Sequence, residues 1–198
     1  THISVEGLKS DITAFRQGKV TRDQAAAKLK VINTESVEVK EPDMELLSSI
    51  FDRLYRQDLS RTYFTSNSVY YERLKDYGAI FYMQVYSSYQ DDYKKYSMPT
   101  QNLEDLDEEA KNKKIVELYP KFEQELKDNI LEYGRTVKSL KNDETLIFNI
   151  TMTKCTGCGI PSTLEVAVKA NVLNEFGAGR MDKSTAASKF TVKKGANQ

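Results

Sequence analysis

Hydrophobic residues near the N-terminus recur at helical spacing. Three of them share one face of a short helix: Leu8, Ile12 and Phe15. Gly18 is placed to end this helix, and Thr21 to cap a second short helix that continues to Lys28. We therefore expect a helical hairpin here, followed by a polar, β-branched linker over residues 33–42.

Two longer amphipathic helices are predicted further along the chain, over residues 42–54 and 106–140. Pro42 favours the start of the first helix, and Pro120 either opens the second half of the second helix or kinks it. The second helix has an apolar stripe made of Ile115, Leu118, Phe122, Leu126, Ile130 and Leu131. The polar stretch 90–102 between the two helices is expected to be a surface loop.

Residues that favour β-structure predominate in two regions. Residues 61–89 predict two or three antiparallel strands, with a turn at Asp76 to Gly78. The clearest strand covers 145–153, where large apolar residues alternate with mostly polar ones. Beyond it, Pro161 is expected to begin a helix that runs through Phe176, and a final short helix follows.

These elements predict an α+β fold, in which a small antiparallel sheet packs against the long helices and short helical hairpins lie at both termini. Three parts are expected: an N-terminal hairpin and linker over 1–40, an α+β core domain over 41–176, and a C-terminal short helix and tail over 177–198. The length of 198 residues suits one core with appended elements.

The two ends of the chain resemble each other at one constant offset. The shared pattern is a Phe, a Gly three residues later, a basic residue, a helix cap and an Ala-Ala pair. It begins at Phe15 and Gly18 near the N-terminus, and it recurs from Phe176 and Gly179 without a gap. The match continues to Val31 and Val192. Each end is similar to the short helical hairpin of many bacterial proteins, the short C-terminal domain, and this resemblance implies a role in packing or oligomerisation.

A second resemblance covers roughly residues 45–175. Three features carry it: Tyr77-Gly78-Ala79-Ile80-Phe81, then Glu132-Tyr133-Gly134-Arg135-Thr136-x-x-x-Leu140-x-x-x-Glu144, and a strand before Cys-x-x-Cys. Together these features are similar to a family of uncharacterised exported bacterial proteins. The resemblance implies an extracytoplasmic location, periplasmic or secreted. The first residue is Thr1 rather than Met, which predicts a processed or trimmed product.

Cys155-Thr156-Gly157-Cys158 is the motif with the clearest chemical potential. Between a strand and a helix start, such a pair can act as a thiol-disulfide centre, since a helix N-terminus lowers a thiol pKa. However, no proline follows Pro161, whereas a thioredoxin fold needs a downstream cis-proline. Cys155 and Cys158 are thus a structural disulfide, a reduced pair, a redox centre, or half of a zinc site shared between subunits.

Tyrosines are concentrated in one region, with ten of the twelve between Tyr55 and Tyr96. A tyrosine-rich sheet could bind a small ligand, and it could equally reflect the preference of tyrosine for half-buried strands. The weak ligand-binding candidates are Tyr63, Tyr71, Tyr82 and Tyr86.

Catalytic residues, cofactors and a metal site within one chain are not predicted. His2 is the single histidine and precedes every core element, so it does not suit a catalytic triad. The 29 basic and 29 acidic residues alternate along the chain, which argues against nucleic-acid binding, and no apolar run approaches the about 18 residues of a membrane span. We therefore expect a soluble, exported, non-catalytic interaction or structural protein with a protein partner or a homo-oligomeric state. Thiol redox activity and small-ligand binding are the alternatives.

Overall fold

The computed structural model describes residues 3–33, 41–56, 60, 62–65, 67–87, 89 and 107–198. His2 and the loop expected over 90–102 lie outside these residues. The chain forms two compact units, Thr1–Lys40 and Glu41–Gln198.

The N-terminal unit contains two short helices flanked by two short strands. Its elements are β1 (Ile3–Glu6), α1 (Lys9–Arg16), α2 (Arg22–Ala26) and β2 (Lys30–Asn33). Gly18, which follows α1, has a φ of 68°, and the Thr21 side chain accepts a hydrogen bond from the Gln24 backbone N–H at the start of α2. α2 ends at Ala26 and does not continue to Lys28. The strands were not predicted, and they pair antiparallel with each other.

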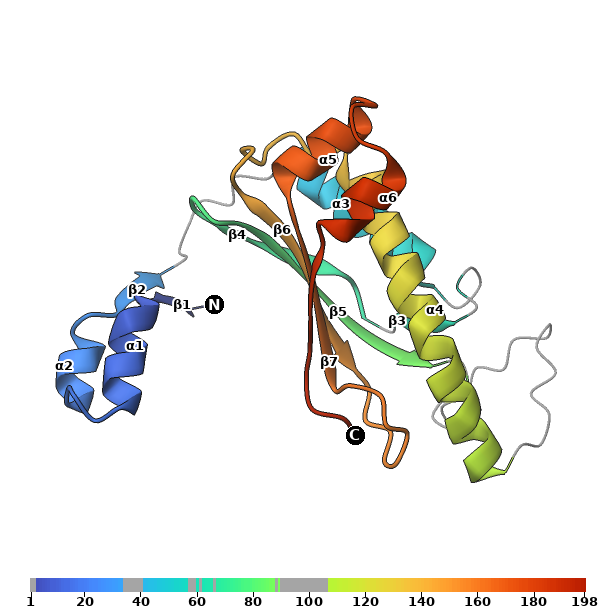
Figure 1. Cartoon of the computed structure of the whole chain (residues 1–198), viewed down its shortest axis with the longest axis horizontal. Helices are drawn as coiled ribbons and strands as arrows, with labels where there is room; N and C mark the ends of the chain where they lie inside the picture. The colour runs from blue at the N-terminus through green and yellow to red at the C-terminus, as the bar shows by residue number, and fades with distance from the viewer. Residues whose placement is uncertain are drawn as a thin grey trace. The chain divides into compact units, whose positions relative to one another are not determined.

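The second unit is an α+β domain, as expected. Its elements are α3 (Pro42–Leu54), β3 (Tyr63–Thr65), β4 (Tyr70–Leu74), β5 (Gly78–Ser87), α4 (Glu108–Gly134), β6 (Thr145–Met152), β7 (Thr163–Lys169), α5 (Ala170–Gly177), α6 (Lys183–Ser188) and β8 (Thr191–Lys194). Its four helices cover the same face of the sheet (Figure 1).

The sheet of this unit is mixed, and the prediction of an antiparallel sheet was wrong at its centre. The strand order is β3-β5-β6-β7-β8, and β4 also pairs with β5. β5 and β6 run parallel from Gly78 opposite Thr145 to Val85 opposite Met152, while the other pairs are antiparallel. Parallel neighbours need a long crossover connection, and α4 lies within the connection between these two strands.

The core lies between the helices and one face of β5 and β6. Phe148 on β6 is fully buried, and its ring centroid lies 4.4 Å from that of Phe51 on α3 and 5.0 Å from that of Phe81 on β5. The alternation along β6 places Leu146, Phe148, Ile150 and Met152 against the helices, as the sequence predicted. Five predicted stripe residues of α4 are buried: Ile115, Phe122, Leu126, Ile130 and Leu131.

The helix expected from Pro161 to Phe176 was wrong over its first half. Residues Thr163–Lys169 form β7, and the helix starts only at Ala170. Leu164, Val166 and Val168 are buried while their neighbours are not, which is the period-two pattern of a strand with one buried face. The segment 177–198, expected to be a separate short helix and tail, is part of the second unit because β8 pairs with β7.

An ion pair between the partly buried Arg73 and the buried Glu144 joins the β4–β5 hairpin to the start of β6. Arg73 Nη2 donates to Glu144 Oε2 at 2.7 Å, and Arg73 Nη1 donates to the Gly78 carbonyl at 2.7 Å. The Lys141 backbone N–H donates to the same Glu144 oxygen at 2.7 Å. Burial alone raises the pKa of Glu144, but the hydrogen bonds from Arg73 and Lys141 outweigh it, so the pKa lies below its ordinary value.

Candidate interaction site

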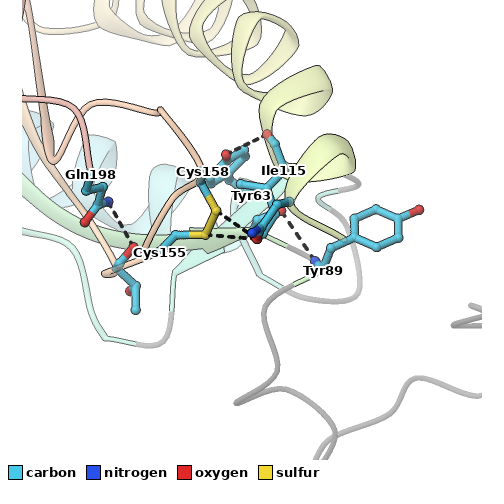
Figure 2. Close-up of a disulfide and its surroundings, with 9 residues drawn as sticks. Tyr63, Tyr89, Ile115, Cys155, Cys158 and Gln198 are labelled. Atoms are coloured by element: carbon cyan, nitrogen blue, oxygen red, sulfur yellow. Dashed lines mark hydrogen bonds between the residues drawn. A yellow bond between two sulfur atoms is a disulfide. The ribbon is translucent and has the colours of Figure 1, made fainter. Parts of the chain in front are cut away.

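The Cys155–Cys158 pair lies in the loop that joins two strands, β6 and β7 (Figure 2). The two cysteines form a disulfide with a Cα–Cα distance of 5.6 Å. Both are buried, and Asn112 Oδ1 on the first turns of α4 lies 3.1 Å from Cys158 Sγ. The C-terminus closes the other side of the loop, where the Gly159 N–H donates to the Gln198 carbonyl at 2.7 Å.

This position does not favour redox chemistry. The expected helix start directly after the pair is absent, since β7 follows it, so the pair lacks the strand–CxxC–helix arrangement of a thiol-disulfide centre. A buried disulfide is also poorly accessible to an attacking thiolate. The arrangement instead suits a structural link that holds the β6–β7 loop against α4.

We predict that Cys155→Ser lowers the free energy of unfolding by about 2 kcal/mol, because the chain-entropy model gives roughly that value for so short a loop. Urea unfolding of the oxidised protein and of the variant measures the difference. Reductant should lower the midpoint of the parent protein to a similar extent and leave the variant unchanged. An unchanged midpoint in the reduced parent would contradict a structural role.

The four candidate tyrosines do not form one site, because they lie on opposite faces of the sheet. Tyr63 and Tyr71 face the helices, where the Tyr63 hydroxyl donates to the Ile115 carbonyl at 3.0 Å. Tyr82 and Tyr86 face the other way along β5. The Tyr82 hydroxyl donates to Glu72 at 3.1 Å, and partial burial together with this carboxylate raises the pKa of Tyr82 to about 12. The geometry therefore provides no shared pocket for these four rings.

The repeat at the two ends of the chain extends to whole structural units. We call residues 3–33 the N-terminal copy and residues 164–194 the C-terminal copy. An offset of 161 residues places α1 on α5, β2 on β8, and α2 on the first five residues of α6. It also maps the pairing of Val5 with Val31 onto that of Val166 with Val192, and the other three pairs follow the same rule. Each copy is a strand, two helices and a returning strand.

The turns inside the two copies agree in detail as well. Gly18 and Gly179 end the first helices with φ values of 68° and 70°. Thr21 and Asp182 cap the second helices by accepting a hydrogen bond from the backbone N–H three residues on. Because pairing register, helix ends and caps all coincide, the similarity is one of fold and not only of a common hairpin motif.

The two copies differ in what covers them. In the C-terminal copy Val166 and Leu173 are 0% and 2% exposed, whereas their counterparts Val5 and Ile12 are 54% and 46% exposed. Ala186 is fully buried, while Ala25 at the same position is only partly buried. Phe15 and Leu29 are exposed too, and their counterparts pack against the core. The N-terminal copy thus exposes the apolar surface that the C-terminal copy buries.

Two elements cover the C-terminal copy. β6 pairs with the edge of β7 that β8 leaves free, and α4 lies against α5 and α6 (Figure 1). A Cβ added to Gly134 on α4 would lie 3.3 Å from Leu173 Cδ1, so the helices approach closely there. In the N-terminal copy, the described strands pair only with each other, so β1 keeps one unpaired edge.

Sequence reasoning identified the repeat and the shared face of Ile12 and Phe15, but it missed Val5 and Leu29 as surface residues of the same unit. The matched Val31 and Val192 lay beyond the predicted helices and were the signal that strands belong to the repeat.

No family model matches this chain, and comparisons with curated proteins and with solved structures gave no match. Among the described residues, no group of three or more His, Cys, Asp or Glu side chains is arranged to hold a metal ion. None of the helices in the described part of the chain has the length and apolar character needed to cross a bilayer.

Proposed function

We propose that this is an exported, non-catalytic interaction protein, in which the second unit is a stable scaffold and the N-terminal copy binds a protein partner. The observation that carries the proposal is the exposure of Val5, Ile12 and Phe15. In the other copy of the same fold, the equivalents of Val5 and Ile12 are buried and the equivalent of Phe15 packs against the core.

Exposure of the apolar side chains of the N-terminal copy to water is energetically unfavourable. Burying an aliphatic or aromatic side chain contributes about 1.5 to 3 kcal/mol, and Ile12, Phe15 and Leu29 all belong to one small unit. A two-stranded sheet with two short helices has little core of its own, so a partner would also stabilise the fold. Both effects favour binding to a complementary surface.

Export is proposed from the cysteines. Disulfides persist in oxidising compartments and are rare in the cytosol. The Cys155–Cys158 bond, held between β6 and β7, fits an extracytoplasmic location. The balanced charge of the chain gives no reason to propose nucleic acid as the partner.

Site-specific photo-crosslinking tests the interaction. A photoreactive phenylalanine analogue replaces Phe15 on the N-terminal copy or, as the matched control, Leu46, an exposed residue on α3. In the cells that produce the protein, the Phe15 position should give a discrete protein adduct that the Leu46 position does not give. The absence of an adduct at Phe15, or the same adducts at both positions, would contradict the proposal.

A further inference from the structure

We propose that the N-terminal copy binds an extended apolar strand of a partner protein, which pairs antiparallel with the free edge of β1, together with a helix of the same partner that covers α1 and α2 and carries a carboxylate near Arg22. This inference rests on the proposed function and specifies the partner. It follows from the surroundings of the C-terminal copy, which show what the same fold accommodates.

The strand is inferred from the place of β7 in the sheet. β7 is paired on both edges, with β8 on one side and with β6, antiparallel, on the other. β1 pairs with β2, which corresponds to β8. Among the described residues, no strand corresponding to β6 pairs with the other edge of β1. Phe148 of β6 lies directly opposite Val166, so the partner strand should place a large apolar residue opposite Val5.

The chemistry of the helix is inferred from α4. Its C-terminal half brings Gly134 against Leu173 and pairs Asp128 with Lys183 at 2.9 Å on α6. The counterpart of Leu173 is Ile12, and the counterpart of Lys183 is Arg22, another basic residue. The partner helix should therefore present a small residue where it crosses Ile12 and a carboxylate near Arg22.

A second folded copy of this chain does not supply these elements. β6 is paired along both edges, with β5 and with β7, and α4 is packed on the core of its own unit. We take the occupant to be a partner protein that offers counterparts of β6 and α4, and its strand adds to the two-stranded sheet as a third strand. Pairing of β1 with the free edge of β1 in a second copy is an outcome that the test below distinguishes.

A peptide derived from β6 serves as the probe. Residues Thr145–Met152, flanked by lysines for solubility, are titrated into the full chain while backbone amide signals are followed by NMR. We expect saturable shifts at Ile3–Glu6 and none at Leu164–Ala167, whose strand is already paired. The peptide with Phe148→Lys should bind at least about tenfold more weakly, since it places a charge opposite Val5. The matched peptide with Asn149→Lys, altered on the other face of the strand, should bind like the parent.

Variants of the protein complete the test. Val5→Asp should weaken peptide binding, and Leu46→Asp on α3 should not. Because the peptide variants leave the protein unchanged, they keep the test valid if Val5→Asp unfolds the N-terminal unit. No shift at Ile3–Glu6, or equal binding of the two lysine-substituted peptides, would overturn the inference. Self-association of the unliganded chain that Val5→Asp abolishes would also overturn it, in favour of a second copy as occupant. In either case a Phe15 crosslink could still support the proposed function.

Discussion

Leu173→Ala should lower the free energy of unfolding by about 3 kcal/mol, whereas Ile12→Ala should change it by less than about 0.5 kcal/mol. The two residues occupy the same position of the repeat. Leu173 is buried against α4, so its truncation leaves a cavity, while Ile12 is 46% exposed and no strand or helix among the described residues covers its exposed part. The difference between the two results measures how unequally the copies are covered.

Urea unfolding followed by far-UV circular dichroism checks this prediction, because the helices of both units contribute to the signal. Val166→Ala and Val5→Ala form a second matched pair on β7 and β1, and they should differ in the same direction. Equal destabilisation by Leu173→Ala and Ile12→Ala would mean that the N-terminal copy is also covered in the free protein.

Arg73→Ala should destabilise the second unit by about 3 to 5 kcal/mol, because it leaves the carboxylate of Glu144 buried without its charged partner. Glu144 is 1% exposed and Arg73 is 26% exposed, so removal of Arg73 leaves the carboxylate with only limited access to water. Lys141→Ala is the control. It breaks the exposed Lys141–Asp76 ion pair nearby, keeps the Lys141 backbone hydrogen bond to Glu144, and should leave the urea midpoint unchanged.

The loss of unfolding free energy caused by Arg73→Ala should also depend on pH. In the parent protein the pKa of Glu144 is lowered, so its stabilising contribution is present above the ordinary value of 4.5 and is lost only as the pH falls through the lower, folded value. Without Arg73, a hydrogen bond and a charge that lower this pKa are lost, so the pKa of Glu144 is higher in the variant than in the parent and the carboxylate takes up a proton at a higher pH. The gap between parent and variant should therefore shrink from neutral pH to about pH 5. A gap that stays constant would show that Glu144 is not the group left unpaired.

Local patterns predicted the elements that have one clear period. The alternation from Leu146 to Met152 gave β6, and the apolar stripe from Ile115 to Leu131 gave α4. The segment after Pro161 was misread because a short strand runs directly into a helix. Its alternation of Leu164, Val166 and Val168 with exposed or half-buried neighbours was outweighed by the apparent helix start at Pro161 and Ser162.

Long-range pairing was harder to predict than local structure. The parallel pairing of β5 with β6 follows from the crossover through α4, and a strand–long helix–strand order is the available signal for it. The exposure of Val5 and Ile12 has no local signal, because among the described residues no counterpart of β6 or α4 adjoins them, and their own sequence does not decide this. The repeat supplied only the comparison that makes this exposure informative.

The duplication shows one fold in two settings. The C-terminal copy closes the sheet of the second unit through β7 and β8, and it is stabilised by β6 and α4. The N-terminal copy keeps the same register and caps without those neighbours. We propose that the surface that packs inside the second unit in one copy serves for binding in the other.

Hydrogen exchange of the free full-length protein, read by mass spectrometry, tests the central claim most directly. The amides of Ile3–Glu6 should exchange orders of magnitude faster than those of Leu164–Ala167, because β1 has one unpaired edge while β7 is paired on both. Comparable protection of the two strands would contradict the account, since the N-terminal copy would then have no free edge to offer a partner.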